Sequence, residues 1–219
     1  MIIKIFCLVL ALPTAQAGDL TTITIPVRVH LIKSTVAPDL NAEVSRQEME
    51  VVFETVNLIW KQAAIQFVIE SITEFDASAE ERYLQASDKT KPLTPLARDI
   101  AKKRMKHACN LQDPGKSMVN LCVVGAMSPG SGGGLAFGSR NRFSLVVWPL
   151  SINGERYLNP ATLAHEFGHA ISLEHNTLED IFLMRGSGNN MRRVGHYDEI
   201  LLADSEIDQA RKAAKKRLR

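Results

Sequence analysis

The strongest constraint on the fold comes from one segment, His165-Glu166-Phe167-Gly168-His169-Ala170-Ile171-Ser172-Leu173-Glu174-His175. On an α-helix, His165 and His169 lie about 6 Å apart along the axis and roughly 40° apart around it, so both imidazoles can face one ion. Glu166 lies one step around the helix, beside that ion. His175 cannot join them on the same helix, because it would lie about 15 Å further along the axis and roughly 80° away from their face. The sequence therefore predicts a helix that ends between 169 and 175, after which the chain turns back to complete a zinc site.

This spacing resembles the motif of the metzincin zinc proteases, H-E-x-x-H-x-x-G-x-x-H followed by a methionine turn. Ser172 stands where the family has glycine. A left-handed turn at such a residue costs about 1 kcal/mol, so we expect either strain or a helix end of different construction. Further on, Leu183-Met184-Arg185-Gly186 is similar to the methionine turn, in which Met184 would lie beneath the metal without binding it.

The resemblance implies one catalytic Zn²⁺ with His165, His169 and His175 as its ligands and Glu166 as the general base. It suggests the matrixins as the nearest group. Two other interpretations of the segment are open. In the first alternative, the segment is a core helix with incidental histidines on its polar side. In the second, it binds zinc but does not catalyse a reaction.

The first 17 residues have the pattern of a signal peptide. Lys4 provides a positive n-region, residues 5–12 an apolar core, and Ala15-Gln16-Ala17 a cleavage site. The apolar run has about 10 residues, whereas a membrane-spanning helix needs about 20. We therefore expect a secreted or periplasmic product without an integral membrane segment, in which residues 18–219 form a single catalytic domain.

Charge and cysteine content restrict the possible partners and the compartment. The formal net charge of +2 argues against nucleic acid as the main partner. We interpret the basic runs 98–107 and 211–219 as solvated helix faces, with an anionic surface as the alternative. Cys109 and Cys122 are the cysteines left after signal removal. An even pair in an oxidising compartment favours a disulfide, and two buried thiols are the alternative. We expect a monomer.

The first part of the chain predicts a strand, a long helix and a second strand. Residues 21–33 alternate and are β-branched, although Pro26 indicates an irregular or edge position there. A helix capped by Asn41 or Ser45 follows and runs to about residue 63, with apolar residues at three- and four-residue spacing. Residues 66–72 form the next strand, and this order predicts a parallel crossover.

The middle of the chain predicts an insertion and then further strands. Residues 76–117 are charged and rich in proline, with a helix expected at 95–109. Residues 118–124 and 142–148 are apolar strands. Between them, residues 128–138 are rich in glycine, which indicates a loop that leads into an edge strand rather than a phosphate-binding loop. In metzincins the substrate-binding edge strand has this place, so the resemblance implies substrate contacts at Gly134, Leu135, Ala136 and Phe137.

The last part of the chain predicts two helices. Asn159-Pro160 is a good start for the zinc helix, and Leu163, Phe167 and Ile171 supply its buried stripe. Gly168 inside this helix favours close packing there. Residues 201–218 form the second helix. His196 and Tyr197 are candidate hydrogen-bond donors to the oxyanion that develops on the scissile carbonyl, and the alternative is that they are ordinary loop residues.

Together these predictions give an α/β (α+β) fold. The resemblance implies a zincin architecture, with a twisted mixed sheet of about five strands packed on a long helix and the zinc helix, and a C-terminal helix behind it. It also implies a zinc-dependent endopeptidase that acts on a protein or peptide substrate, and the signal-peptide pattern predicts that this enzyme is exported. The alternative is an exported zinc-binding interaction module with little or no catalytic activity.

Overall fold

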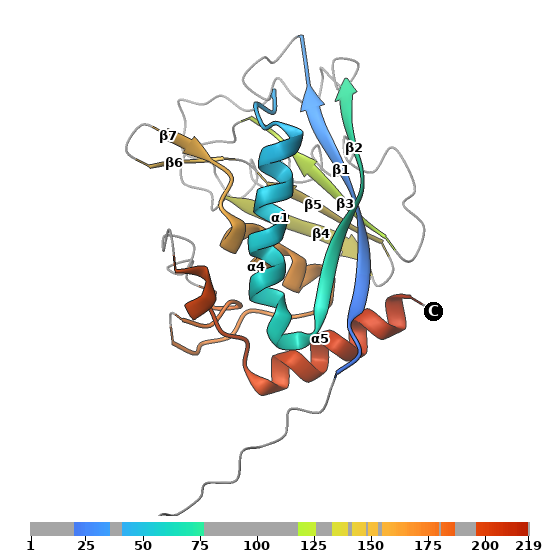
Figure 1. Cartoon of the computed structure of the whole chain (residues 1–219), viewed down its shortest axis with the longest axis vertical. Coiled ribbons are helices and arrows are strands. Elements are labelled where there is room, and N and C mark those ends of the chain that lie inside the picture. Colours follow the sequence, from blue (N-terminus) through green and yellow to red (C-terminus); the bar gives the residue numbers. More distant parts are fainter. Residues whose placement is uncertain are drawn as a thin grey trace, which may run out of the picture.

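The computed structural model describes residues 20–35, 41–76, 118–125, 133–139, 142–147, 149–152, 155–179, 181–186 and 196–218, and the structural statements below refer to them. The elements follow one another as β1 (Ile23–Lys33), α1 (Arg46–Trp60), η2 (Lys61–Ala63), β2 (Ile65–Asp76), β3 (Val119–Val123), β4 (Gly134–Ser139), β5 (Arg142–Val147), β6 (Leu150–Ile152), β7 (Glu155–Tyr157), α4 (Pro160–Ala170), η5 (Tyr197–Glu199) and α5 (Asp204–Arg217). The mixed α/β class predicted from the sequence is confirmed (Figure 1).

The main sheet has the strand order β2-β1-β3-β5-β4. Strands β2, β1, β3 and β5 are parallel, as the crossover prediction requires for β1 and β2. Strand β4 is antiparallel to β5 and lies at the edge of the sheet. A separate hairpin of β6 and β7 was not predicted, because strands of three residues are too short to show an alternating pattern.

Strand β1 lies inside the sheet, and its alternating sequence explains how it is covered. Ile23, Ile25, Val27, Val29 and Leu31 are buried on one face. Pro26 pairs with β2 only, since the pairing of β1 with β3 begins at Val27. The expected edge character is therefore local to the first residues of the strand, where a missing amide donor is tolerated.

Helix α1 begins at the predicted cap. The Ser45 hydroxyl accepts a hydrogen bond from Glu48 N, and the Glu48 carboxylate accepts one from Ser45 N, which forms a capping box. The predicted apolar face of the helix is buried, and it consists of Met49, Val52, Phe53, Val56, Ile59 and Trp60. The α-helix ends at Trp60, and η2 continues it to the predicted boundary at Ala63.

The core between the sheet and the helices fixes the position of α4. The Phe167 ring stacks on Phe67 of β2 at a centroid distance of 4.0 Å and meets Phe53 of α1 edge-on at 5.7 Å. The Trp60 indole Nε1–H donates to the Ala164 carbonyl at 3.2 Å. These contacts join α1, β2 and α4, so α4 packs against α1 as well as against the sheet (Figure 1).

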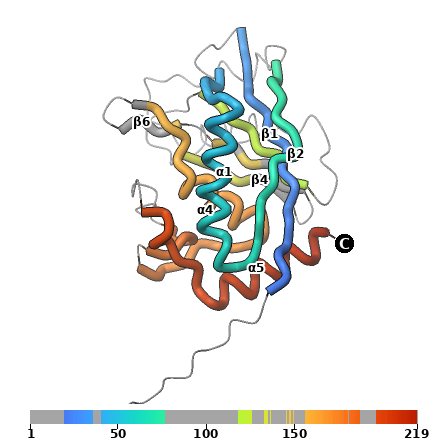
Figure 2. The backbone as a smooth tube through the Cα atoms, viewed as in Figure 1, coloured from blue at the N-terminus to red at the C-terminus, as the bar shows by residue number. Residues whose placement is uncertain are grey.

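Helix α5 lies across the ends of η2 and β1 (Figures 1 and 2). Its buried face includes Ala210 and Ala214. The helix starts at Asp204 rather than at Leu201, because Leu201 is extended and exchanges backbone hydrogen bonds with Ile181 and Leu183. The guanidinium of Arg211 donates to the carbonyls of Ala63 at 2.6 Å and Thr21 at 3.1 Å, which anchors α5 to the start of β1.

Several predictions lie outside the described residues. These are the signal peptide 1–17, the helix 95–109 with Cys109, and the first part of the glycine-rich stretch 128–138. Cys122 is described and is buried in β3. Because Cys109 lies outside the described residues, the disulfide between Cys109 and Cys122 stays a prediction. Among the described residues, no helix has the length and apolar character needed to cross a membrane.

Candidate metal centre

Helix α4 carries the first two histidines and begins as predicted. The Asn159 side chain caps it by accepting hydrogen bonds from Ala161 N at 2.8 Å and Thr162 N at 3.4 Å, and Pro160 is the first helical residue. Leu163, Phe167 and Ile171 are fully buried. His165 is only 3% exposed and Glu166 only 6%, whereas His169 is half-buried.

The helix ends within the predicted interval, at a left-handed turn on Ser172. Ser172 has φ 68°, and its N–H donates to His169 O at 3.0 Å, while Leu173 N donates to Gly168 O at 2.9 Å. This pair of bonds forms a Schellman motif, whose left-handed position is usually glycine. A non-glycine residue there costs about 1 kcal/mol, so of the two alternatives left open by the sequence, a strained Ser172 is the one present.

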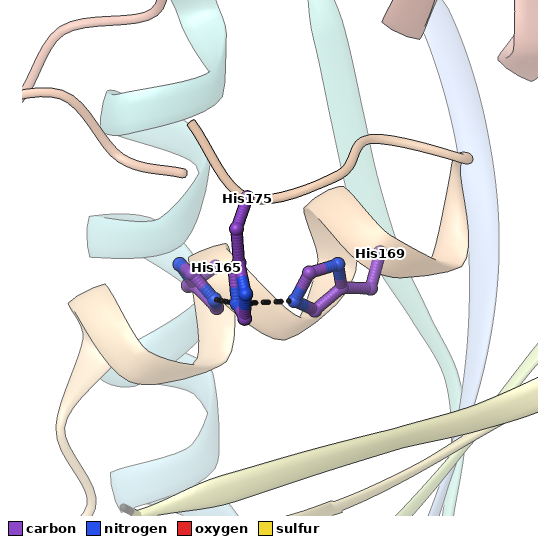
Figure 3. A group of neighbouring side chains, drawn as sticks. All are labelled: His165, His169 and His175. Atoms are coloured by element: carbon purple, nitrogen blue, oxygen red, sulfur yellow. Dashed lines mark hydrogen bonds between the residues drawn. The ribbon is translucent and has the colours of Figure 1, made fainter. Parts of the chain in front are cut away.

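The turn brings His175 back to the two helical histidines (Figure 3). The His175 Nε2 atom lies 3.0 Å from His165 Nε2 and 3.1 Å from His169 Nε2. Two imidazole nitrogens that bind one tetrahedral zinc ion at about 2.0–2.1 Å are about 3.3–3.4 Å apart, which is close to these distances. Within the described part of the chain, this is the group of histidine, cysteine and carboxylate side chains whose geometry fits one metal ion.

Backbone carbonyls set the tautomers of the helical histidines. The Nδ1–H of His165 donates to Leu183 O at 2.7 Å, and that of His169 donates to Leu173 O at 2.9 Å. Because a carbonyl can only accept, both Nε2 atoms keep a lone pair that points into the cluster. Burial lowers the pKa of His165 to about 4 and also lowers the pKa of His169. The rings are therefore neutral near pH 7, which is the form that binds zinc.

The segment around Met184 lies directly against α4. A Cβ atom added at Gly168 would lie 2.3 Å from the Met184 sulfur, so the fully buried methionine packs on the bare backbone of the helix. Asn176 N donates to Met184 O at 2.8 Å, which links this segment to the residue after His175. The close packing predicted at Gly168 is thus present, with Met184 as its partner.

The side chain of Glu166 extends from α4 to the start of the edge strand β4. A Cβ atom at Gly134 would lie 2.6 Å from Glu166 Cγ and 3.0 Å from Oε1, so β4 approaches this carboxylate closely. Burial raises the pKa of Glu166 to about 8. A divalent cation nearby would lower this pKa again, because it favours the charged carboxylate.

The pairing of β4 shows which backbone groups lie at the free edge. Val147 O accepts from Val124 N, so the peptide groups of Val147 face β3. Ala136 pairs with Leu145, two residues before Val147, and strand groups alternate in direction. Ala136 therefore belongs to a pair that is not hydrogen-bonded with β5. Its N–H and C=O face outward, and so do those of Gly134.

Three other residues, of which His196 and Tyr197 are candidates from the sequence, have different surroundings. His196 lies at the surface, where its Nδ1 is 3.4 Å from Glu199 Oε1, and Tyr197 packs against the core, which favours their interpretation as loop residues. His30 contacts Thr73 and Asn120 through its two ring nitrogens, which fits a strand histidine without a metal role. The carbonyls of Leu183 and Leu173 were not predicted as partners of the histidines, because a backbone acceptor leaves no signal in the sequence.

Comparison with protein families identifies the class. The sequence model of the reprolysin-like metallopeptidases, family M12B, matches residues 46–176, which include α1, strands β2 to β5 of the sheet and the three histidines. The chain belongs to this family of zinc metallopeptidases. A particular closeness to the matrixins is not shown by this match. A search of curated proteins found no significant match to the sequence.

The chain is similar to several solved structures of low sequence identity, of which archaemetzincin supports the fold. Archaemetzincin from Methanopyrus kandleri is 12% identical with a TM-score of 0.53, and the match covers 91% of this chain and 99% of that chain. Metalloproteinase-II from Bacteroides fragilis is 15% identical with a TM-score of 0.48 over 89% of this chain. A chain in a chaperone–substrate complex is 16% identical with a TM-score of 0.48 over 91% of this chain. The present chain spans 55% of the Bacteroides protein and 36% of the chain in that complex.

Proposed function

We propose that this chain is an exported zinc-dependent endopeptidase that uses Glu166 as its general base. The observation that carries the proposal is the convergence of three imidazoles on one point beside a buried carboxylate. His165, His169 and His175 would hold one zinc ion, and they leave its fourth position to water. A bound zinc ion would lower the pKa of its water ligand toward about 7 and would polarise the carbonyl group of the peptide bond that is cleaved.

Glu166 would accept the proton of the attacking water and then donate it to the leaving amine as the C–N bond breaks. Its burial supports this role, because a carboxylate with few competing water molecules exchanges a proton readily with a group placed beside it. The close approach of Gly134 also supports it, because Gly134 limits the positions that the Glu166 side chain can take. The proposal thus assigns catalysis to Glu166 and metal binding to the histidines.

The substrate class follows from the free edge of β4. An extended peptide can add to this edge as an antiparallel strand through the outward groups of Gly134 and Ala136. Backbone hydrogen bonds do not depend on the side chains of the peptide, so peptides of many sequences could bind. Both ends of an extended peptide can continue beyond the site. We therefore propose internal cleavage of protein or peptide substrates, with Leu135 and Phe137 as the neighbouring residues of the same strand.

The test is cleavage of a quenched peptide by purified protein, together with its zinc content, in the wild type and in Glu166→Ala. We expect about one zinc per chain, cleavage that stops with a chelator and returns with zinc, and at least about a 100-fold lower turnover in Glu166→Ala with its zinc retained. Full activity of Glu166→Ala would exclude this mechanism. Zinc binding without any cleavage of a peptide library would favour the interaction module instead.

A further inference from the structure

The C-terminal helix contacts the chain on both sides of the third histidine. We infer that α5 acts as a clamp that holds the Ser172 turn and thereby positions His175, in place of the glycine that the zinc motif lacks. Gln209 is the positioning residue at the centre of this clamp. The inference rests on the proposed zinc site, and it assigns to α5 a role in metal binding that its place in the fold alone does not require.

Three side chains of α5 make these contacts. Gln209 Nε2 donates to Ser172 O at 2.6 Å. The Arg217 guanidinium donates to Ala170 O at 2.8 Å, and Glu206 Oε1 accepts from Asn176 Nδ2 at 2.6 Å. The contacted residues are the last residue of α4, the strained residue of the turn, and the residue that follows His175.

The clamp has a fixed base. Glu206 and Gln209 are three residues apart, and Arg217 lies three helical turns after Glu206, so all three project from one side of α5. The helix itself is held by the buried Ala210 and Ala214 and by the bonds from Arg211 to Ala63 O and Thr21 O. A displacement of the turn would therefore break its hydrogen bonds to α5, because α5 is held in place by the rest of the fold.

A displacement of the turn would also disturb two zinc ligands at once. Leu173 follows Ser172 directly, and its carbonyl accepts the hydrogen bond that orients His169. His175 follows two residues later. Left-handed backbone at a non-glycine residue persists only where its surroundings hold it. The bond from Gln209 to the Ser172 carbonyl supplies such support at the strained residue itself.

The experiment is a double-mutant cycle with Gln209→Ala and Ser172→Gly, in which the zinc dissociation constant is measured by competition with a chelator. We expect Gln209→Ala to weaken zinc binding by about 3- to 10-fold, less than the loss of a direct histidine partner. Ser172→Gly removes the strain and should bind zinc as tightly as the wild type or more tightly. In the Ser172→Gly background, Gln209→Ala should have at most about half of its effect on a logarithmic scale.

Two controls separate positioning from general stability. Lys212→Ala changes an exposed side chain on the same helix and should leave zinc affinity unchanged. Gln209→Glu keeps the size of the side chain but replaces the donor by an acceptor, so it should bind zinc at least as weakly as Gln209→Ala. The visible spectrum of the Co²⁺-substituted protein reports ligand geometry, and we expect it to change in Gln209→Ala but not in Lys212→Ala.

The failures are distinguishable. A wild type that binds no zinc would remove the proposed function and this inference with it. A wild type that binds zinc and cleaves peptide, combined with an unchanged dissociation constant and Co²⁺ spectrum in Gln209→Ala, would overturn the inference alone. If Gln209→Ala weakened zinc binding equally in the wild type and in the Ser172→Gly background, the clamp would not compensate for the glycine that the motif lacks.

Discussion

Single residues control how closely the backbone approaches the site. Gly168 lets the Met184 side chain reach the helix that carries two of the histidines, and Gly134 lets the edge strand reach Glu166. Both glycines lie where a methyl group would be nearer than 3 Å to a side-chain atom. Their role is therefore a matter of space, which local sequence preferences do not reveal.

At this scale we expect Gly134→Ala to lower peptide cleavage by about 10- to 100-fold, because the new methyl group would displace Glu166 from its position. Zinc content should stay the same, since the three atoms nearest to this methyl position all belong to Glu166. Steady-state kinetics with a quenched peptide and metal analysis of the same sample check both parts. Cleavage at the wild-type rate would show that this close approach does not limit the position of the carboxylate.

Among the elements, β4 has the most direct connection to the proposed substrate. It is an edge strand, it contacts α4, and its outward peptide groups alternate with groups that pair with β5. This alternation gives neighbouring residues different roles, although they lie on the same strand. The groups of Ala136 are open to a ligand, whereas those of Leu135 belong to the ladder with β5.

We expect Ala136→Pro to raise KM for peptide substrates by about 10-fold, because it removes one outward amide donor from the edge without breaking a bond to β5. Leu135→Pro is the matched comparison. It removes a ladder bond inside the sheet, so its main effect should be a lower unfolding temperature. Peptide kinetics and thermal unfolding of both variants make the test. Unchanged kinetics in Ala136→Pro would contradict substrate placement on β4 and leave the zinc site intact.

For the whole molecule, the proposals of export and of a disulfide can be tested together. The mature protein should begin near Gly18 and contain a bond between Cys109 and Cys122. This loop of 13 positions should stabilise the fold by about 3 kcal/mol. The intact mass of the exported, non-reduced protein, with N-terminal sequencing, checks both. Two free thiols would refute the disulfide, and an intact residue 1 would refute processing.

The sequence by itself determined the local features of this protein. Asn159-Pro160 predicted the start of α4, and the spacing of the histidines predicted its end. The departure from glycine predicted either strain at Ser172 or a helix end of different construction, and the left-handed Ser172 has the strain. The alternating pattern of β1 and the apolar face of α1 were also correctly predicted. These features depend on side-chain periodicity and on capping groups a few residues apart, so a local segment contains all the information that they need.

Only the tertiary structure decided which distant groups meet. The order of the strands, the approach of Gly134 to Glu166, the carbonyl of Leu183 beside His165, and the contact of Gln209 with Ser172 all join residues that are far apart in the chain. Backbone carbonyls and glycines have no side-chain pattern that could predict such partners. Their positions result from packing the core around Phe167 and anchoring α5, which are properties of the folded chain as a whole.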